Sequence, residues 1–149
     1  MVTRFELGPY AIEADVERTR AYYRDAPPMD GGCGCQGCRN YDLWSRTAVP
    51  GAVRDWFDAL GVELNKPART HVYYPKADGT LFYGGFYHVC GAMLNELERR
   101  GGPFIHIDAD YDVSLTSECD LLEDDFPRPC FQVEIEFTLP WLLDEPCEY

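Results

Sequence analysis

The sequence has few basic residues, and no part of it is continuously apolar. It carries 13 Lys and Arg against 26 Asp and Glu, which gives a formal net charge of −13. This balance excludes a nucleic-acid backbone or an anionic membrane surface as partner, because both require clustered basic side chains. No stretch approaches the roughly 20 apolar residues of a membrane span, and the N-terminal region lacks the apolar run of a signal peptide. We therefore expect a cytoplasmic protein.

Motifs of common enzymes are also missing. The sequence contains no P-loop and no G-x-S-x-G, which mark phosphate and acyl-transfer sites. Its three histidines are scattered, and no nucleophile, base and acid stand out as a set. These absences favour a protein that is not an enzyme.

The composition is that of a folded domain. The chain has 149 residues, of which 46% are hydrophobic and 14% aromatic, enough to bury a core. We expect one domain over residues 1–149. The seven cysteines are an odd number, and in a reducing compartment they are expected as thiols and not as a disulfide framework.

Caps and apolar periodicity predict four helices. The clearest starts after Pro50, carries apolar residues at i, i+3, i+4 and i+7, and ends at Gly61. A second begins after Asp15, a good N-cap residue, and runs to about Arg24. The other two are a short helix over 40–46 and a helix over 92–100.

Residues 69–90 predict a β-hairpin. Asp78-Gly79 is a strong signal for a two-residue turn, and aromatic and β-branched residues flank it. Such a turn would place Arg69 opposite His88. Gly84-Gly85 in the second arm predicts a bulge or a close approach of another backbone.

Two further segments, 105–115 and 131–139, alternate between apolar and polar residues. This period of two is that of a half-buried antiparallel strand, and most of the polar positions are acidic. Strands and helices do not alternate as βαβ units. The sequence therefore predicts an α+β fold, with a single domain, an antiparallel sheet of four or more strands, and helices packed mainly on one face.

The densest chemical feature is the stretch GCGCQGCRNY at residues 32–41. It places Cys33, Cys35 and Cys38 within six residues in a glycine-rich turn. Thiolates prefer zinc, copper(I) or iron–sulfur units, and a structural zinc takes four tetrahedral ligands at about 2.3 Å from each sulfur. The loop supplies three ligands, so the fourth must come from another segment or from solvent.

The predicted hairpin offers that fourth ligand. In the register of a two-residue turn, His71 and His88 share one sheet face, and either of them, or Cys90, is expected within reach of the loop. We therefore predict a zinc site with the ligands Cys33, Cys35, Cys38 and His88. The remaining cysteines are expected to be structural: Cys119, Cys130 and Cys147.

Two other interpretations of the cysteine loop stay open. In the first, the thiols are small groups of a tightly packed turn. In the second, Cys33 and Cys35, or Cys35 and Cys38, exchange a disulfide. Cys38 precedes a predicted helix, and the dipole of a helix lowers the pKa of a thiol at its start.

The polar positions of the alternating strands form a second candidate site. They are His106, Asp108, Asp110, Asp112, Glu134 and Glu136. They do not match a calcium loop, because Val113 and Cys119 occupy the positions of the required glycine and glutamate. The acidic face is either a solvated surface or a docking site for a basic protein partner, as in an immunity protein that neutralises a toxin.

Four stretches of the chain resemble a family of small uncharacterised bacterial proteins: CGCQGCRNY, PGAVRDWFDALG, FYGGFYHVCGAM and FQVEIEFTLPW. The resemblance spans most of the chain and implies a bacterial cytoplasmic protein, with no assigned reaction, cofactor or catalytic residue. The leading hypothesis is thus a non-enzymatic protein whose cysteine loop binds zinc. An acidic, immunity-like interaction protein and a thiol redox protein are the alternatives.

Overall fold

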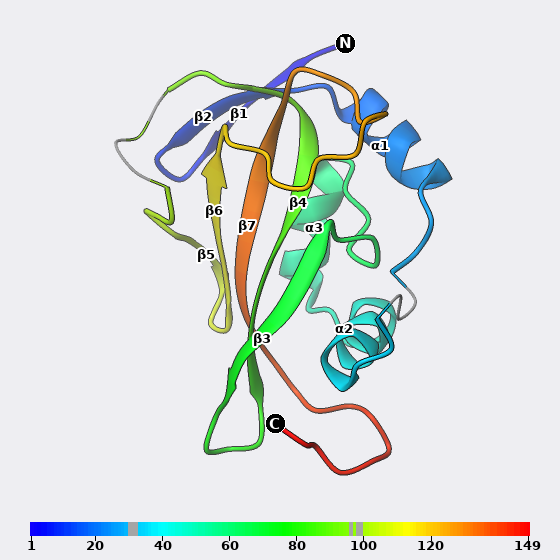
Figure 1. Ribbon diagram of the computed structural model, residues 1–149. Coiled ribbons are helices and arrows are strands. Elements are labelled where there is room, and N and C mark those ends of the chain that lie inside the picture. The colour runs from blue at the N-terminus through cyan, green and yellow to red at the C-terminus, as the bar shows by residue number, and fades with distance from the viewer. Residues whose placement is uncertain (30–32, 96, 98–99) are drawn as a thin grey trace.

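The protein folds into a seven-stranded antiparallel sheet with three helices packed against it (Figure 1). The structure, a computed structural model, describes residues 1–29, 33–95, 97 and 100–149. The strands are β1 (Thr3–Leu7), β2 (Tyr10–Ala14), β3 (Arg69–Pro75), β4 (Leu81–Met93), β5 (Ile105–Asp108), β6 (Tyr111–Thr116) and β7 (Cys130–Leu139). The helices are α1 (Val16–Asp25), α2 (Gln36–Thr47) and α3 (Gly51–Ala59). The predicted α+β fold is confirmed.

The strands follow the order β1-β2-β4-β7-β6-β5, and β3 pairs with β4 beside this path. The long β4 pairs along one edge with β3 and then with β2. Along its other edge it pairs with β7 over ten residues. The sheet is strongly curved, because Gly8 in the β1–β2 turn lies against Ile105 of β5 although β1 and β5 are opposite edges.

The alternation of β7 determines which face the helices cover. Its odd-numbered residues are at most 1% exposed, and they are Phe131, Val133, Ile135, Phe137 and Leu139. Phe137 packs against Trp44 of α2 and Phe57 of α3. Burial of these side chains is the main stabilising term of the fold, at about 1.5–3 kcal/mol for each large apolar residue.

Local signals at the helix ends agree with two of the predicted helices. Asp15 caps α1, where its carboxylate accepts a hydrogen bond from the Arg18 amide at 3.1 Å. Helix α3 follows Pro50, and the chain leaves it through Gly61 in a left-handed conformation with φ +85°. Helix α2 is longer than the predicted 40–46, because the Cys35 side chain caps it one turn earlier.

The β3–β4 hairpin differs from the two-residue turn predicted for it. Its loop is five residues long, and the Lys76 amide donates to the Thr80 carbonyl. Arg69 therefore lies opposite Phe86, two residues away from His88. The register shift lies at Tyr73 and not at the glycine pair.

The glycine pair of β4 instead allows close approach, the second of the two predicted roles. A Cβ on Gly84 would overlap the Tyr73 ring, and a Cβ on Gly85 would overlap the Arg69 carbonyl. Both contacts come from β3, which crosses β4 closely at this point. These glycines therefore hold β3 in place rather than interrupting β4.

Residues 105–115 are a hairpin and not the single strand that their alternation predicted. Strands β5 and β6 join through a tight turn at Ala109 and Asp110. The Asp108 carboxylate accepts from the Ala109 amide, and the Asp110 carbonyl accepts from the Thr138 amide on β7. The turn is thus stabilised by hydrogen bonds that an alternating pattern does not reveal.

The helix predicted over 92–100 is wrong for the residues that the structure describes. Ala92 and Met93 end β4 and pair with β2. The Asn95 side chain bridges the Ala11 amide and the Pro9 carbonyl, which anchors an irregular segment to the β1–β2 hairpin. Residues 96, 98 and 99 lie outside the described part of the chain.

Gly91 of β4 pairs with Ala14 of β2. Replacement of Gly91 tests whether the close approach of these two strands requires a glycine. A Cβ at Gly91 would overlap the Glu13 carbonyl oxygen, and its φ of +152° is unfavourable for other residues. We expect Gly91→Ala to lower the free energy of unfolding by at least about 2 kcal/mol, measured by urea denaturation.

The matched control for Gly91 is Gly51→Ala in the first turn of α3. No atom lies within 4 Å of a Cβ built there. Alanine favours a helix over glycine, so this variant should be unchanged or more stable by up to about 1 kcal/mol. Equal stability of the two variants would contradict the role assigned to Gly91.

Candidate metal centre

The three cysteines of the loop come together at the start of α2. Cys33 Sγ lies 3.1 Å from Cys35 Sγ and 2.9 Å from Cys38 Sγ, and all three sulfurs lie within 4.8 Å of one another. Gly34 makes this possible, because its φ of +71° folds Cys33 back toward the helix. The three cysteines, which are close together in the sequence, therefore also form a cluster in the structure. We call them the cysteine triad.

The cysteine triad has a geometry that can hold a metal ion. Tetrahedral ligands at about 2.3 Å from a zinc are separated from one another by about 3.8 Å. The sulfurs would therefore need to move apart by less than about 1 Å to bind zinc in this arrangement. Cys33 and Cys35 are exposed and Cys38 is half-buried, so an ion can enter from solvent.

The hydrogen bonds within the triad and the burial of Cys38 shift the pKa values of two of its thiols in opposite directions. Hydrogen bonds to Cys38 and Cys35 lower the pKa of Cys33 to about 7. Burial, followed by hydrogen bonds to Cys33 and Cys35, raises the pKa of Cys38 to about 12. The N-terminus of α2 adds a favourable dipole, since the Cys38 amide donates to Cys35 Sγ at 3.4 Å. A divalent cation would replace the shared protons and stabilise all three thiolates.

The C-terminal segment 145–149 lies beside the triad, and sequence reasoning missed it. The Gln36 amide donates to the Pro146 carbonyl at 2.9 Å and accepts from the Glu148 amide at 2.9 Å. The Tyr149 hydroxyl accepts from the Gly37 amide at 3.0 Å. Three hydrogen bonds from Gln36 and Gly37 of α2 thus fix a segment that is more than 100 residues away in the sequence. A cysteine at position 147 was the one hint available in the sequence.

The structure does not bring His88 to the triad. The β4 side chains that reach α2 are Tyr83 and Tyr87. Side chains alternate along a strand, so His88 points to the other face of the sheet, away from α2. His88 is 4% exposed, and its Nε2 lies 2.9 Å from the Gln132 amide oxygen on the neighbouring β7. Burial lowers the His88 pKa, which keeps the ring neutral at pH 7.

The two other predicted donors also lie away from the triad. His71 pairs with Gly84, on the same face as His88, and its ring packs against Tyr73. Cys90 is buried opposite Cys130, whose Sγ lies 3.6 Å from Cys119 Sγ. The three cysteines at positions 90, 119 and 130 therefore gather at a different place from the triad.

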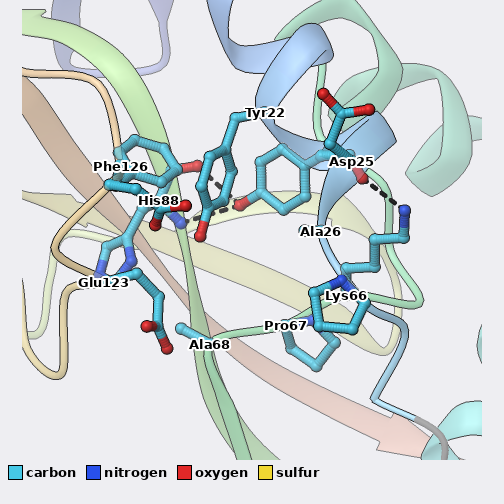
Figure 2. A pocket seen from close by; sticks show the side chains of 12 residues that line it. Tyr22, Asp25, Ala26, Lys66, Pro67, Ala68, His88, Glu123 and Phe126 are labelled. Carbon is cyan, nitrogen blue, oxygen red and sulfur yellow. Dashed lines mark hydrogen bonds between the residues drawn. The ribbon is translucent and has the colours of Figure 1, made fainter.

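A cleft of about 460 Å³ lies beside His88 (Figure 2). Tyr22, His88, Glu123 and Phe126 line one side of it, and Lys66 lies on the other. The Lys66 ammonium donates to the Tyr23 carbonyl and so caps the end of α1. Lys66 and His88 of this lining are thus engaged in hydrogen bonds that hold the fold.

The acidic sheet face is partly neutralised by one arginine. The Arg100 guanidinium forms ion pairs with Glu118 at 3.1 Å, with Glu134 at 2.7 Å and with Asp120. Gln132, which is fully buried, donates to the carboxylates of Asp120 and Glu134. Part of this face is therefore an ordered network and not a simple solvated surface.

Comparison with family models, with curated protein sequences and with solved structures found no match to this chain. The resemblance to small bacterial proteins consequently rests on the four quoted motifs alone, of which the structure confirms the clustering of the cysteines. No helix in the described part of the chain has the length and apolarity needed to cross a membrane.

The Arg100 network predicts a pH-dependent loss of stability. Hydrogen bonds from Arg100 and then Gln132 lower the pKa of Asp120. A carboxylate whose pKa is lower in the folded chain stabilises the fold above its unfolded pKa, about 3.9, and this contribution disappears as the pH falls through the folded value. We expect Arg100→Ala to cost about 1 kcal/mol at pH 7 by urea denaturation, and less at pH 3.

Arg4→Ala is the control for Arg100, because the Arg4–Glu6 pair is more than 60% exposed on both sides. A single exposed pair contributes little, so this variant should change stability by less than about 0.5 kcal/mol at either pH. A cost for Arg100→Ala that is the same at pH 7 and pH 3 would contradict the electrostatic explanation.

Proposed function

We propose that this protein is a non-enzymatic, zinc-binding domain in which Cys33, Cys35 and Cys38 hold the metal. The observation that carries the proposal is the convergence of three sulfurs within 4.8 Å of one another at the start of α2. Thiolates with this spacing are typical ligands of structural zinc.

The role of such a zinc would be to fix α2 to the segment that precedes it. Cys35 and Cys38 belong to the first turn of α2, whereas Cys33 belongs to the preceding loop. Tyr41 and Trp44 anchor the rest of the helix in the core, where both are fully buried. An ion shared by the three sulfurs would connect an exposed loop to that rigid element and restrict its motion.

A disulfide-exchanging thiol stays a prediction as the second interpretation of the triad. The lowered pKa of Cys33 would suit that role as well as it suits metal binding. The number of converging sulfurs favours the metal, because disulfide exchange needs two cysteines and the loop brings three together. The reducing bacterial cytoplasm that the sequence predicts would keep all three thiols available to an ion.

A basic protein partner also stays a prediction. The net charge of −13 favours it, and Asp108 and Asp110 stand exposed at the β5–β6 turn. Binding of that kind would weaken steeply with salt, which metal binding by thiolates would not.

Metal content tests the proposed function directly. Protein purified without chelator or an affinity metal should contain about one zinc per chain by elemental analysis. Cys35→Ser should lose it, because the central ligand of the triad is removed. Cys119→Ser is the matched control and should keep the metal, since Cys119 lies with Cys130 away from the triad. Freshly reduced wild-type protein that binds no zinc would refute the proposal.

Removal of the metal should also lower thermal stability. A ligand that binds only the folded chain stabilises it by about 2.7 kcal/mol at a concentration 100 times its Kd. We expect a chelator to lower the Tm by several degrees, and added zinc to restore it. Cys35→Ser should melt at the same temperature with and without chelator, and a drop in that variant would contradict the triad as the binding site.

A further inference from the structure

We propose that Cys147 is the fourth zinc ligand, so that the C-terminal segment closes a four-cysteine site begun by the triad. This inference rests on the proposed function and extends it to a residue that the sequence analysis took as structural. It assigns the segment 145–149 a role in metal binding. Its support is the set of contacts that fix this segment against the loop.

Gln36 holds the backbone on both sides of Cys147. Its side-chain nitrogen donates to the Pro146 carbonyl at 2.9 Å, and its side-chain oxygen accepts from the Glu148 amide at 2.9 Å. Gln36 directly follows Cys35 in the chain. Cys147, which lies between the two clamped backbone groups, is therefore held beside the side chain of the residue that follows Cys35.

Further contacts to the C-terminal segment come from residues close to the triad in the sequence. Arg39 donates to the Gly34 carbonyl at 3.2 Å and to the Glu145 carboxylate at 2.7 Å, and so ties the loop to the C-terminal segment. The Tyr149 hydroxyl accepts from the Gly37 amide. Residues 36, 37 and 39 thus engage the segment, and they lie between and beside Cys35 and Cys38 in the chain.

The chain between β7 and Cys147 is anchored along α2 as well. The buried Asn40 donates to the Pro140 carbonyl at 3.1 Å and accepts from the Leu142 amide at 2.8 Å. The Trp141 indole donates to the Glu145 carbonyl at 2.8 Å. Figure 1 shows the segment, coloured orange to red, passing α2 on its way to the C-terminus. Its path is therefore set before Cys147 is reached.

The other soft donors of the described chain lie elsewhere. His71 and His88 point to the opposite face of the sheet, and Cys90, Cys119 and Cys130 gather where the pairing of β4 with β7 ends. Cys147 is exposed, and its sulfur is not part of the group within 4.8 Å. Ligation therefore requires the Cys147 side chain to turn toward the triad, where a fourth thiolate would complete the tetrahedron. Glu145 is engaged with Arg39 and Gln36, which leaves Glu148 and water as the competing fourth ligands.

Cobalt(II) bound to the full chain, under reducing conditions, is the probe that tests this ligand. Wild-type protein should show the spectrum of tetrahedral cobalt with four thiolates. Cys147→Ser should lose about a quarter of the thiolate-to-cobalt charge-transfer absorbance, since one of four sulfurs is removed. Its zinc affinity should fall by more than the roughly 10–100-fold typical of changes outside the ligand shell.

Two control variants separate ligation from docking of the segment. Glu148→Gln should keep the full charge-transfer intensity and affinity, and a loss of affinity there with no change in Cys147→Ser would make the carboxylate the ligand and overturn the inference. Gln36→Ala removes the clamp but no sulfur. It should weaken binding while the saturated protein keeps the intensity of four thiolates.

The outcomes also separate this inference from the proposed function. If wild-type protein and Cys147→Ser bind cobalt and zinc alike, with the same spectrum, the triad is a metal site and Cys147 is not its ligand. If the wild-type chain binds neither metal, both proposals fail. Since Cys147 is exposed, its serine variant should fold, and an unchanged Tm under chelator would confirm this.

Discussion

The pairing of β4 with β7 over ten residues is the constraint on which the rest of the structure depends. It runs from Leu81 opposite Leu139 to Cys90 opposite Cys130, and it fixes which side chains of both strands face the helices. Tyr83 and Tyr87 then reach across to Gly37 and Tyr41 of α2. A shift of one residue would turn these groups to the other face and bury the acidic ones. The register of β4 and β7 therefore determines where α2 lies, and with it the position of the cysteine triad at the start of that helix.

Much of this fold could be predicted, because its signals are local. The Asp15 cap, the Pro50–Gly61 limits of α3 and the alternation of residues 131–139 each depend on a few neighbouring residues. The wrong predictions concern segments whose secondary structure is determined by a contact with a distant part of the chain. Asp110 accepts from Thr138 and turns one predicted strand into a hairpin. Met93 pairs with Ile12 and extends a strand where a helix was predicted.

The candidate site divides in the same way. The three cysteines of the triad lie within six residues of the sequence, and the left-handed conformation of Gly34 brings their sulfurs together. His88 was chosen because it shares a sheet face with His71, but the β4 side chains that reach α2, Tyr83 and Tyr87, lie on the other face. The contacts between Gln36 and residues 146 and 148 join segments 110 and 112 apart in the sequence. No periodicity or spacing rule covers such a contact, so a single sequence could not reveal it.

Gly37 links the surface of the molecule to its interior. Its amide donates to the Tyr149 hydroxyl outside, and its carbonyl accepts from the Tyr83 hydroxyl in the core at 2.7 Å. Two turns further along α2, the Trp44 indole is fully buried and stacks on the Tyr111 ring at 5.7 Å. Tilting or fraying of the start of α2 would be transmitted to this stacked pair. The fluorescence of Trp44 is therefore a built-in optical reporter of events at the cysteine loop, more than one helical turn away from the sulfurs themselves.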